Sequence, residues 1–305
     1  MLYGLRSHNH NIFSLFSVYS LPIQRAEEIM STSWYKKNRE TVFYTHGFKG
    51  IPTGPAVTAV VNTYLKMDCN IALLNWELLA GEMQSHGIPD SYFNWAAPNG
   101  RMVGARFADT LVDLIKAGVD LNNTHLVGHS LGAQVFGITG NTLAARGIRI
   151  QRITGLDPTH FGFDNKPPSS RLHPGSAVFV AVIHTDPDKY GMTKSMGTVD
   201  FWPNFKAVGV VVQPGCRDGG RPEILSADNK CSHDRSWQLF IDALNYPGSI
   251  LGSYAINYKT WKHYRNQERL AVVLDIGSYH PNIVPGNYYF STKAASPFGL
   301  GINGL

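Results

Sequence analysis

Charged residues are scarce in this chain, and no charge of one sign is concentrated in a stripe. Asp, Glu, Lys and Arg make up 16% of the 305 residues and 43% are hydrophobic, which excludes a disordered polyelectrolyte and predicts a folded globular protein. The formal charge of +5 permits a weak attraction to anionic surfaces. The densest basic cluster, Lys36, Lys37 and Arg39, has no interleaved stacking aromatics. We therefore expect no nucleic-acid partner.

Long apolar runs and cysteines are also few. The longest apolar run, residues 177–183, has the length of a buried strand, so we expect no transmembrane segment. Three cysteines, Cys69, Cys216 and Cys231, are too few for a disulfide scaffold and lack the paired spacing of a zinc site. Cys216 and Cys231 could close a loop, which would indicate an oxidising compartment, or be ordinary free thiols, and their count alone leaves both open.

The order of predicted elements indicates an α/β fold. Short β-rich runs predict strands at residues 41–45, 70–76, 124–128, 150–156 and 177–184. Helices are predicted at residues 55–65 and around Val103, Phe107, Leu111 and Leu114, which fall on one helical face. Strands separated by helices need crossover connections, which favour a mostly parallel sheet covered on both faces. Repeats and domain linkers are absent, so residues 1–305 are predicted as a single domain.

The strongest chemical signal is Gly128-His129-Ser130-Leu131-Gly132, which follows a predicted strand and opens a predicted helix. A G-x-S-x-G sequence in this context is typical of a nucleophile elbow, where small flanking residues make room for a strained serine. The helix N-terminus points unpaired amides at the reacting centre, so the Leu131 N–H can stabilise an oxyanion.

A serine nucleophile needs a base and an acid that orients the base. Asp157 directly follows the strand after the Ser130 helix, so we expect it at the same edge of the sheet and favour it as the acid. The alternatives are Asp186, which ends the next strand, and Asp164, Asp188 and Asp200, which are predicted to lie in loops as solvated carboxylates.

Position eliminates several of the histidines as the base. His129 lies inside the elbow, His46 and His125 precede the serine, and His184 ends an apolar strand, where a hydrogen-bonded core histidine is the common outcome. The histidines that remain are His233, His263 and His280. We favour His233 because it follows Cys231 and precedes a predicted helix at residues 234–244, where a loop residue can be held rigid over the sheet edge.

Seven ordered segments resemble successive landmarks of the pancreatic lipase family, and together they span nearly the whole chain. They are Tyr44-Thr45-His46-Gly47-Phe48, Val127-Gly128-His129-Ser130-Leu131-Gly132, Ile153-Thr154-Gly155-Leu156-Asp157-Pro158, Val182-Ile183-His184-Thr185-Asp186, Asp200-Phe201-Trp202-Pro203-Asn204, Gln213-Pro214-Gly215-Cys216 and Cys231-Ser232-His233-Asp234-Arg235-Ser236. The resemblance implies an α/β-hydrolase domain with Ser130, Asp157 and His233 as catalytic triad. It also implies that the backbone N–H groups of Phe48 and Leu131 form the oxyanion hole.

Departures from the family pattern carry further expectations. The chain stops where a C-terminal β-sandwich would begin, and residues 2–6 resemble the first strand, so we expect a secreted protein whose sequence is N-terminally incomplete. The family's calcium ligands would fall near residues 171–176, where no carboxylate is present, so we expect no structural calcium, other metal or cofactor. Cys69 has no counterpart for its family partner and is expected to be free, with Cys216 and Cys231 bonded across a lid.

The expected function is hydrolysis of lipid carboxylesters at a membrane or lipoprotein interface. The lid at residues 217–230 has only Ile224 and Leu225 as large aliphatic residues, and the loop at residues 187–199 is short. Short versions of both loops go with phospholipase A1 activity in this family, so cleavage of phospholipid sn-1 esters is favoured over triacylglycerol hydrolysis. A catalytically silent lipid carrier or yolk-type protein is the alternative of another class, which the three triad residues argue against.

Overall fold

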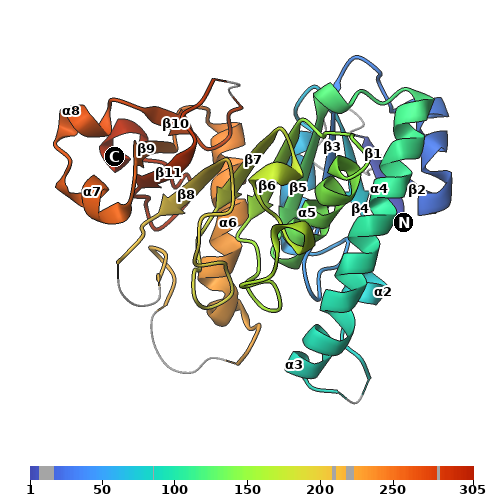
Figure 1. The fold of residues 1–305 in the computed structure, drawn as a ribbon, viewed down its shortest axis with the longest axis horizontal. Coiled ribbons are helices and arrows are strands. Elements are labelled where there is room, and N and C mark those ends of the chain that lie inside the picture. The colour runs from blue at the N-terminus through green and yellow to red at the C-terminus, as the bar shows by residue number, and fades with distance from the viewer. Residues whose placement is uncertain (7–16, 85, 208–210, 218–222, 280–281) are drawn as a thin grey trace.

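One mixed β-sheet forms the centre of the fold in the computed structural model, which describes residues 1–6, 17–84, 86–207, 211–217, 223–279 and 282–305. The eleven strands of this sheet within the described residues are ordered β10-β9-β11-β8-β7-β6-β5-β3-β4-β1-β2 (Figure 1). Their bounds are β1 (Leu2–Arg6), β2 (Ser17–Leu21), β3 (Glu40–Thr45), β4 (Cys69–Leu74), β5 (Thr124–His129), β6 (Arg152–Leu156), β7 (Phe179–Ile183), β8 (Val199–Pro203), β9 (Leu251–Ala255), β10 (Val273–Asp275) and β11 (Gly286–Phe290).

The sheet is parallel in its middle and antiparallel at both ends. Strands β4, β3, β5, β6, β7, β8 and β11 run parallel to one another. Strands β1 and β2 add an antiparallel pair beyond β4, and β9 and β10 add another beyond β11. The predicted mostly parallel sheet is therefore confirmed.

Helices connect the strands and cover the sheet. The α-helices are α1 (Pro55–Tyr64), α2 (Glu77–Ala80), α3 (Ile88–Ser91), α4 (Ala97–Ala117), α5 (Leu131–Ala144), α6 (Ala227–Asn245), α7 (Tyr258–His263) and α8 (Asn266–Arg269). A π-helical turn, η2 (Tyr92–Ala96), joins α3 to α4. Short 3-10 segments are η1 (Ile23–Ser31), η3 (Leu121–Asn123), η4 (Pro168–Ser170), η5 (Pro174–Ser176) and η6 (Gly301–Gly304).

Two hydrophobic cores lie on opposite faces of the sheet. Successive residues of β3 show the alternation, because Phe43 packs into the core beneath α4 and α5, whereas Val42 and Tyr44 pack into the core beneath α1 and α6. Both faces of the central strands are thus buried, which explains the consecutive apolar residues in the middle of β3 and β5. The α/β class predicted from the sequence is confirmed.

The fold corrects two local expectations. Asp200 was expected in a loop, but it lies inside β8 and is buried. His233 was expected in a loop before a helix, but α6 begins at Ala227, so His233 is already within the second turn of that helix. The loop that approaches the site therefore ends earlier than the sequence suggested.

The parallel strands bring the chemically interesting residues to one edge. Ser130 directly follows β5, Asp157 directly follows β6, and Thr185 lies two residues beyond β7. Because the carboxyl ends of neighbouring parallel strands meet at one edge of a sheet, these three residues share that edge. The start of α6 and the short helix α3 lie at the same lower end of the molecule in Figure 1.

Candidate active site

Ser130 occupies a sharp turn between β5 and α5. Its backbone has φ 57° and ψ −122°, a strained conformation for a residue with a side chain. A Cβ on Gly128 would lie 2.5 Å from the Gly132 carbonyl oxygen, and a Cβ on Gly132 would lie 2.6 Å from the backbone of Thr45. Both glycines are therefore required by close approach of the backbone, as the nucleophile-elbow pattern predicts.

Two backbone amides flank the elbow. Leu131 is the first residue of α5, so its N–H has no partner within the helix. A Cβ on Gly47 would lie 3.2 Å from the Leu131 nitrogen and 2.8 Å from the Ser130 Cβ, so the loop that carries Phe48 is packed against the elbow. The next residue of this loop, Lys49, donates its N–H to the Ala80 carbonyl at 2.7 Å, which ties the loop to α2.

Asp157 and His233 form a buried hydrogen-bonded pair. The His233 Nδ1 lies 2.6 Å from the Asp157 Oδ2, although the two residues are 76 positions apart in the sequence. The other carboxylate oxygen of Asp157 accepts N–H hydrogen bonds from Thr185 at 2.8 Å and from Asp186 at 3.1 Å. Three donors therefore fix the Asp157 carboxylate, and the bond at Nδ1 leaves the His233 Nε2 as the nitrogen that can accept a proton.

His233 lies beside the elbow. Its ring centroid is 4.7 Å from that of His129, the residue directly before Ser130. The ring of Tyr190 lies on another side of His233, at 5.1 Å between centroids. Tyr190 could not be found from the sequence, since its position in an irregular loop gives no periodic or motif signal.

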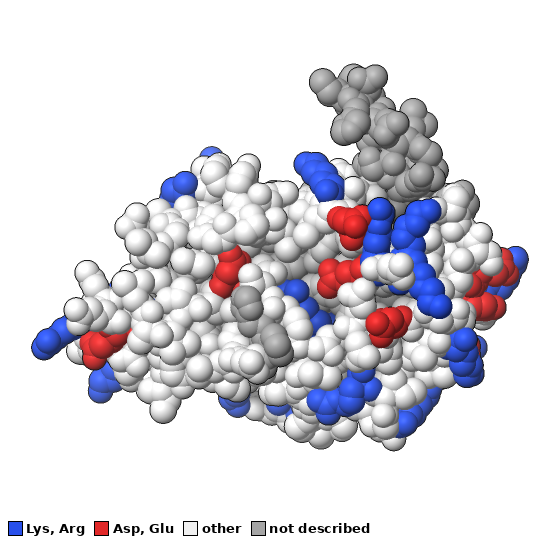
Figure 2. Space-filling view, turned by 90° about the horizontal axis from the view of Figure 1, so that it is seen from above, with Lys and Arg blue, Asp and Glu red and all other residues white. Residues whose placement is uncertain are grey.

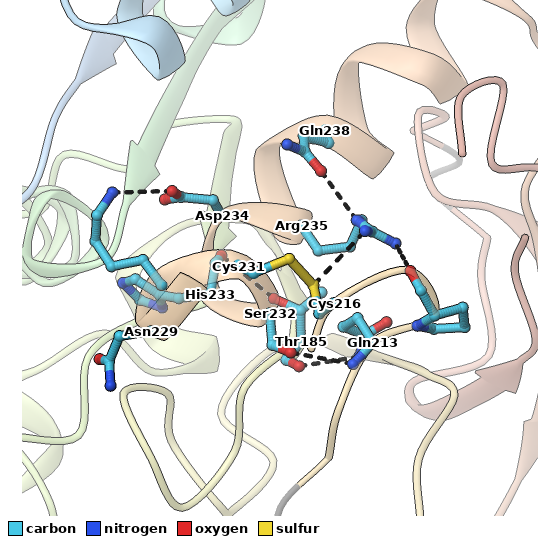
Figure 3. The surroundings of a disulfide bond; sticks show 12 residues. Thr185, Gln213, Cys216, Asn229, Cys231, Ser232, His233, Asp234, Arg235 and Gln238 are labelled. Atoms are coloured by element: carbon cyan, nitrogen blue, oxygen red, sulfur yellow. Dashed lines mark hydrogen bonds and ion pairs between the residues drawn. A yellow bond between two sulfur atoms is a disulfide. The ribbon is translucent and has the colours of Figure 1, made fainter. Parts of the chain in front are cut away.

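The disulfide fixes the segment that supports His233. Cys216 and Cys231 are bonded with their Cα atoms 5.6 Å apart, and Cys69 is free, as expected. Figure 3 shows Gln213, just before the bridge, with its side-chain nitrogen 2.9 Å from the Thr185 carbonyl oxygen. The Gln213 N–H donates to Ser232 at 3.0 Å. The bridged loop is thus held against both the β7 end and α6.

A cationic side chain supports the same loop. The Arg235 guanidinium donates to the Pro214 carbonyl at 2.7 Å and to Gln238 at 2.9 Å (Figure 3). Its other terminal nitrogen lies 3.7 Å from the Cys216 sulfur. Arg235 therefore connects α6 to the loop independently of the covalent bridge.

Carboxylates set the electrostatics around His233. Burial opposes a charge on this ring, but the hydrogen bond to Asp157 and the charges of Asp157, Asp234 and Asp186 outweigh burial and raise the pKa of His233. Burial and the nearby Asp157 carboxylate raise the pKa of Asp186 to about 7. Within the described residues, neither carboxyl oxygen of Asp186 has a hydrogen-bond partner. The Asp186 carboxyl group therefore lies near the pair without a hydrogen bond to it, although the Asp186 backbone N–H is bonded to Asp157.

His129 remains neutral at this position. Burial, followed by the charge of His233, lowers the pKa of His129 to about 3. Its Nε2 lies 4.0 Å from Asp234, whose side chain is bonded to Lys230 at 2.9 Å. Because His129 does not charge at physiological pH, it does not compete with His233 for a proton.

The structure separates the favoured residues from the alternatives. His263 lies on exposed α7, far from α5 in Figure 1, with its Nδ1 2.7 Å from the Lys259 carbonyl oxygen. His280 lies outside the described residues.

His184 is a buried histidine paired with Asp200 at 2.8 Å, and this pair gives both residues a structural role. Asp164 lies 3.2 Å from His160, and Asp188 is exposed in a turn.

The described part of the chain holds neither a cluster of metal ligands nor a membrane-spanning helix. Among these residues no group of three or more His, Cys, Asp or Glu side chains is gathered that could hold a metal. No described helix combines the length and the apolarity needed to cross a bilayer. The face in Figure 2 shows Lys and Arg interspersed with Asp and Glu, most densely over the half formed by the N-terminal strands.

These features define an α/β-hydrolase fold with a serine elbow at the carboxyl edge of its sheet. The chain belongs to the lipase family, because the profile of the family described as Lipase matches residues 18–298.

Curated relatives agree with this assignment. Lipase member H-B of Xenopus laevis is 35% identical over 230 residues, covering 73% of this chain and 45% of the relative. Phospholipase A1 VesT1.02 of Vespa tropica is 32% identical over 216 residues, covering 70% of this chain and 68% of the relative. The chain thus spans about half the length of the lipase member H relatives that it matches.

Among solved structures, a phospholipase/carboxylesterase from Dyadobacter fermentans matches with a TM-score of 0.32 and 12% identity. The match covers 54% of this chain and 68% of that protein.

Proposed function

We propose that this chain hydrolyses lipid carboxylesters with Ser130 as nucleophile, His233 as general base and Asp157 as the acid that orients His233. The observation that carries the proposal is the buried 2.6 Å bond between Asp157 and His233, formed beside the strained serine turn. A histidine held at Nδ1 by a carboxylate and placed next to a serine elbow is the arrangement that serine hydrolysis needs.

The proposed reaction proceeds in two halves. His233 Nε2 takes the proton of the Ser130 hydroxyl as the serine oxygen attacks the ester carbonyl carbon, and the Phe48 and Leu131 N–H groups stabilise the resulting oxyanion. The protonated His233 then gives its proton to the departing alcohol oxygen as the ester bond breaks, leaving an acyl-serine. Water, deprotonated by His233, attacks the acyl carbonyl, and His233 returns the proton to Ser130 as the fatty acid leaves.

The favoured substrate is a phospholipid cleaved at its sn-1 ester. One supporting fact is that a relative covered over two thirds of its length is named as a phospholipase A1. Another is the polar sequence of the lid, in which Ile224 and Leu225 are the only large aliphatic residues. Residues 218–222 of this lid lie outside the described part of the chain.

The two loops that flank the site also contact each other. Leu225 in the lid segment donates its N–H to the Tyr190 hydroxyl at 3.2 Å, and Lys189 donates to the Asn229 carbonyl at 2.6 Å. Short loops braced in this way favour an open, polar-rimmed site that admits a charged head group over a lid driven by a lipid interface. Triacylglycerol hydrolysis is the alternative substrate class.

The same proposal places the protein outside the cell and at the surface of a membrane or lipoprotein. The Cys216–Cys231 bond supports an oxidising compartment. The single sheet supports one catalytic domain over residues 1–305.

The test compares hydrolysis of phosphatidylcholine vesicles, emulsified long-chain triacylglycerol and a soluble short-chain ester. We expect turnover on the soluble ester and a preference for the vesicles over the emulsion. Ser130→Ala should lose at least about a thousandfold in kcat on every substrate without unfolding. Activity retained by Ser130→Ala would contradict the proposed nucleophile. A preference for the emulsion, with a jump in rate above the solubility limit, would reverse the choice of substrate.

A further inference from the structure

Large apolar side chains are exposed on two neighbouring segments, α2 and the π-helical turn η2. Leu78 is 89% exposed, Phe93 is 49% exposed and Trp95 is 37% exposed. Trp95 is the most exposed of the six tryptophans. Single exposed apolar residues need no explanation, but a cluster of large ones marks an interaction surface.

The two segments are physically joined. The Trp95 indole N–H lies 3.4 Å from the Leu78 carbonyl oxygen, and the Asn99 amide donates to the Leu79 carbonyl at 3.3 Å. We call the surface made by Leu78, Phe93 and Trp95 the α2–η2 surface. The first contact ties α2 to η2 and the second ties α2 to α4, so the three exposed side chains lie on adjoining segments.

The wide turn explains why neighbouring residues of η2 all face outwards. Pro98 lies near the start of α4 and has no N–H for the carbonyl of Asn94, and its ring would crowd that carbonyl in a regular helix. The chain instead closes a wider turn, in which the Ala97 N–H bonds to the Tyr92 carbonyl. Phe93, Asn94 and Trp95 are consequently three consecutive exposed residues.

The α2–η2 surface is continuous with the candidate active site. On one side, α2 accepts the hydrogen bond from Lys49, the residue after Phe48. On the other side, the ring of Tyr92 contacts Phe48 at 5.3 Å and Phe93 at 5.2 Å between centroids. Apolar surface thus extends from the proposed oxyanion loop outwards to the exposed ring of Phe93.

Aromatic rings also extend from Phe93 towards the other side of the site. Phe93 lies 6.3 Å from Phe161, and Phe161 lies 6.2 Å from Tyr190, the residue beside His233. Phe93 therefore connects the outer patch to rings that reach both the proposed oxyanion loop and the proposed base.

Charges around the surface do not favour an anionic partner. Lys49 is paired with Glu82, and His86 lies 3.6 Å from Asp90. Glu77 adds a further acidic residue in the first turn of α2. Arg101, which donates to the Gly162 carbonyl beside Phe93, adds one cation. Acidic and basic side chains therefore nearly balance, so an anionic surface gains no net attraction here, whereas a zwitterionic surface offers apolar contact that needs no such attraction.

We propose that the α2–η2 surface inserts into the surface of a zwitterionic phospholipid bilayer and so places lipid esters at the mouth of the candidate site. This inference rests on the proposed function. Leu78 supplies aliphatic contact, and Phe93 and Trp95 supply rings that sit at the boundary between head groups and acyl chains. The lid is then not the main element that senses the lipid surface.

The experiment measures sedimentation with phosphatidylcholine vesicles and, separately, hydrolysis of a soluble short-chain ester. Leu78→Glu should weaken vesicle binding by about tenfold or more, because the transfer of one leucine side chain is lost. Leu78→Met should bind as the parent protein does. Ile256→Glu is the matched control, since Ile256 is 69% exposed but lies after β9, and it should leave vesicle binding unchanged.

Fluorescence gives an independent measurement. Tryptophan emission should be quenched by phosphatidylcholine brominated on its acyl chains, and Trp95→Phe should remove most of this quenching while binding persists. High salt should change the affinity for the vesicles by less than about threefold, since the proposed binding involves no net attraction between charges.

The outcomes separate this inference from the proposed function. Loss of vesicle binding in Leu78→Glu, with soluble ester hydrolysis retained, supports the α2–η2 surface. Unchanged vesicle binding in Leu78→Glu, or unchanged quenching in Trp95→Phe, overturns it and points to a protein partner for the patch. Absence of soluble ester hydrolysis in the parent protein would instead refute the proposed function, whatever the vesicles show.

Discussion

Replacement of Asp157 by Asn tests the proposed triad at the position where the structure is most restrictive. One oxygen of Asp157 faces the His233 Nδ1, and the other accepts two backbone N–H groups, from Thr185 and Asp186. An asparagine must direct its single oxygen towards those two fixed donors, because its amide N–H₂ cannot accept from them. The amide nitrogen then faces His233.

This orientation reverses the proton on the imidazole. A donor facing His233 forces Nδ1 to act as acceptor, so the hydrogen moves to Nε2, the nitrogen that should accept the Ser130 proton. The change therefore removes the base without removing its side chain. The loss of the orienting carboxylate, together with the wrong tautomer of His233, should lower kcat about 10⁴-fold with little change in KM.

The assay measures kcat and KM on a soluble ester, together with the thermal unfolding midpoint. Asp186→Asn is the matched control, because Asp186 is equally buried and one strand further along but has no hydrogen bond to His233. We expect Asp186→Asn to retain activity within about tenfold, since an asparagine resembles the neutral acid that burial favours there. Full activity in Asp157→Asn, or its loss only in Asp186→Asn, would refute the choice of acid.

Three further predictions concern pH and redox state. The pKa of His233 is raised above its ordinary value of 6.5, and only neutral His233 accepts a proton. We therefore expect kcat/KM to increase with pH through a midpoint above 6.5. A pH profile with its midpoint below 6.5 would contradict this expectation. Thiol titration of the denatured, unreduced protein should find one sulfhydryl, that of Cys69, which in the native protein reacts slowly because burial raises its pKa to about 12. Reduction of Cys216–Cys231 should lower stability by roughly 3 kcal/mol and also lower kcat, and unchanged activity would show that the bridge does not support His233.

The central strands and the elbow could be predicted from the sequence because local patterns determine them. The sequence predicts a strand at residues 41–45, and the structure has β3 at Glu40–Thr45. It also predicts a strand at residues 124–128, and the structure has β5 at Thr124–His129. A strand buried on both faces carries apolar residues at consecutive positions, as in Val42-Phe43-Tyr44 and Leu126-Val127, so its position shows in the sequence. The glycines around Ser130 are similarly local, because the turn itself requires them.

The position of His233 in a helix could not be predicted in this way. The first turns of α6 bury Asn229, Ser232 and His233, and the first buried large apolar residue of the helix is Leu239. Apolar periodicity therefore begins only after the part that faces the site, and a pattern search places the helix start too late. The polar face is buried because its partners are polar: Gln213 bonds to Ser232, and Asp157 bonds to His233.

Strand β8 is difficult to predict from the sequence for a related reason, because it contains the buried carboxylate of Asp200. Asp200 interrupts an otherwise apolar run, but its side chain accepts N–H bonds from Met196 at 2.8 Å and Gly197 at 3.1 Å and pairs with His184. Burial of a charge is tolerated only with such a set of donors, and none of them is adjacent in the sequence. A carboxylate at a strand end therefore has two outcomes in this fold. Both Asp200 and Asp157 bond to a histidine. The histidine of Asp200 stacks on Trp202, whereas the histidine of Asp157 packs against His129 beside Ser130, and only these tertiary contacts distinguish the two carboxylates.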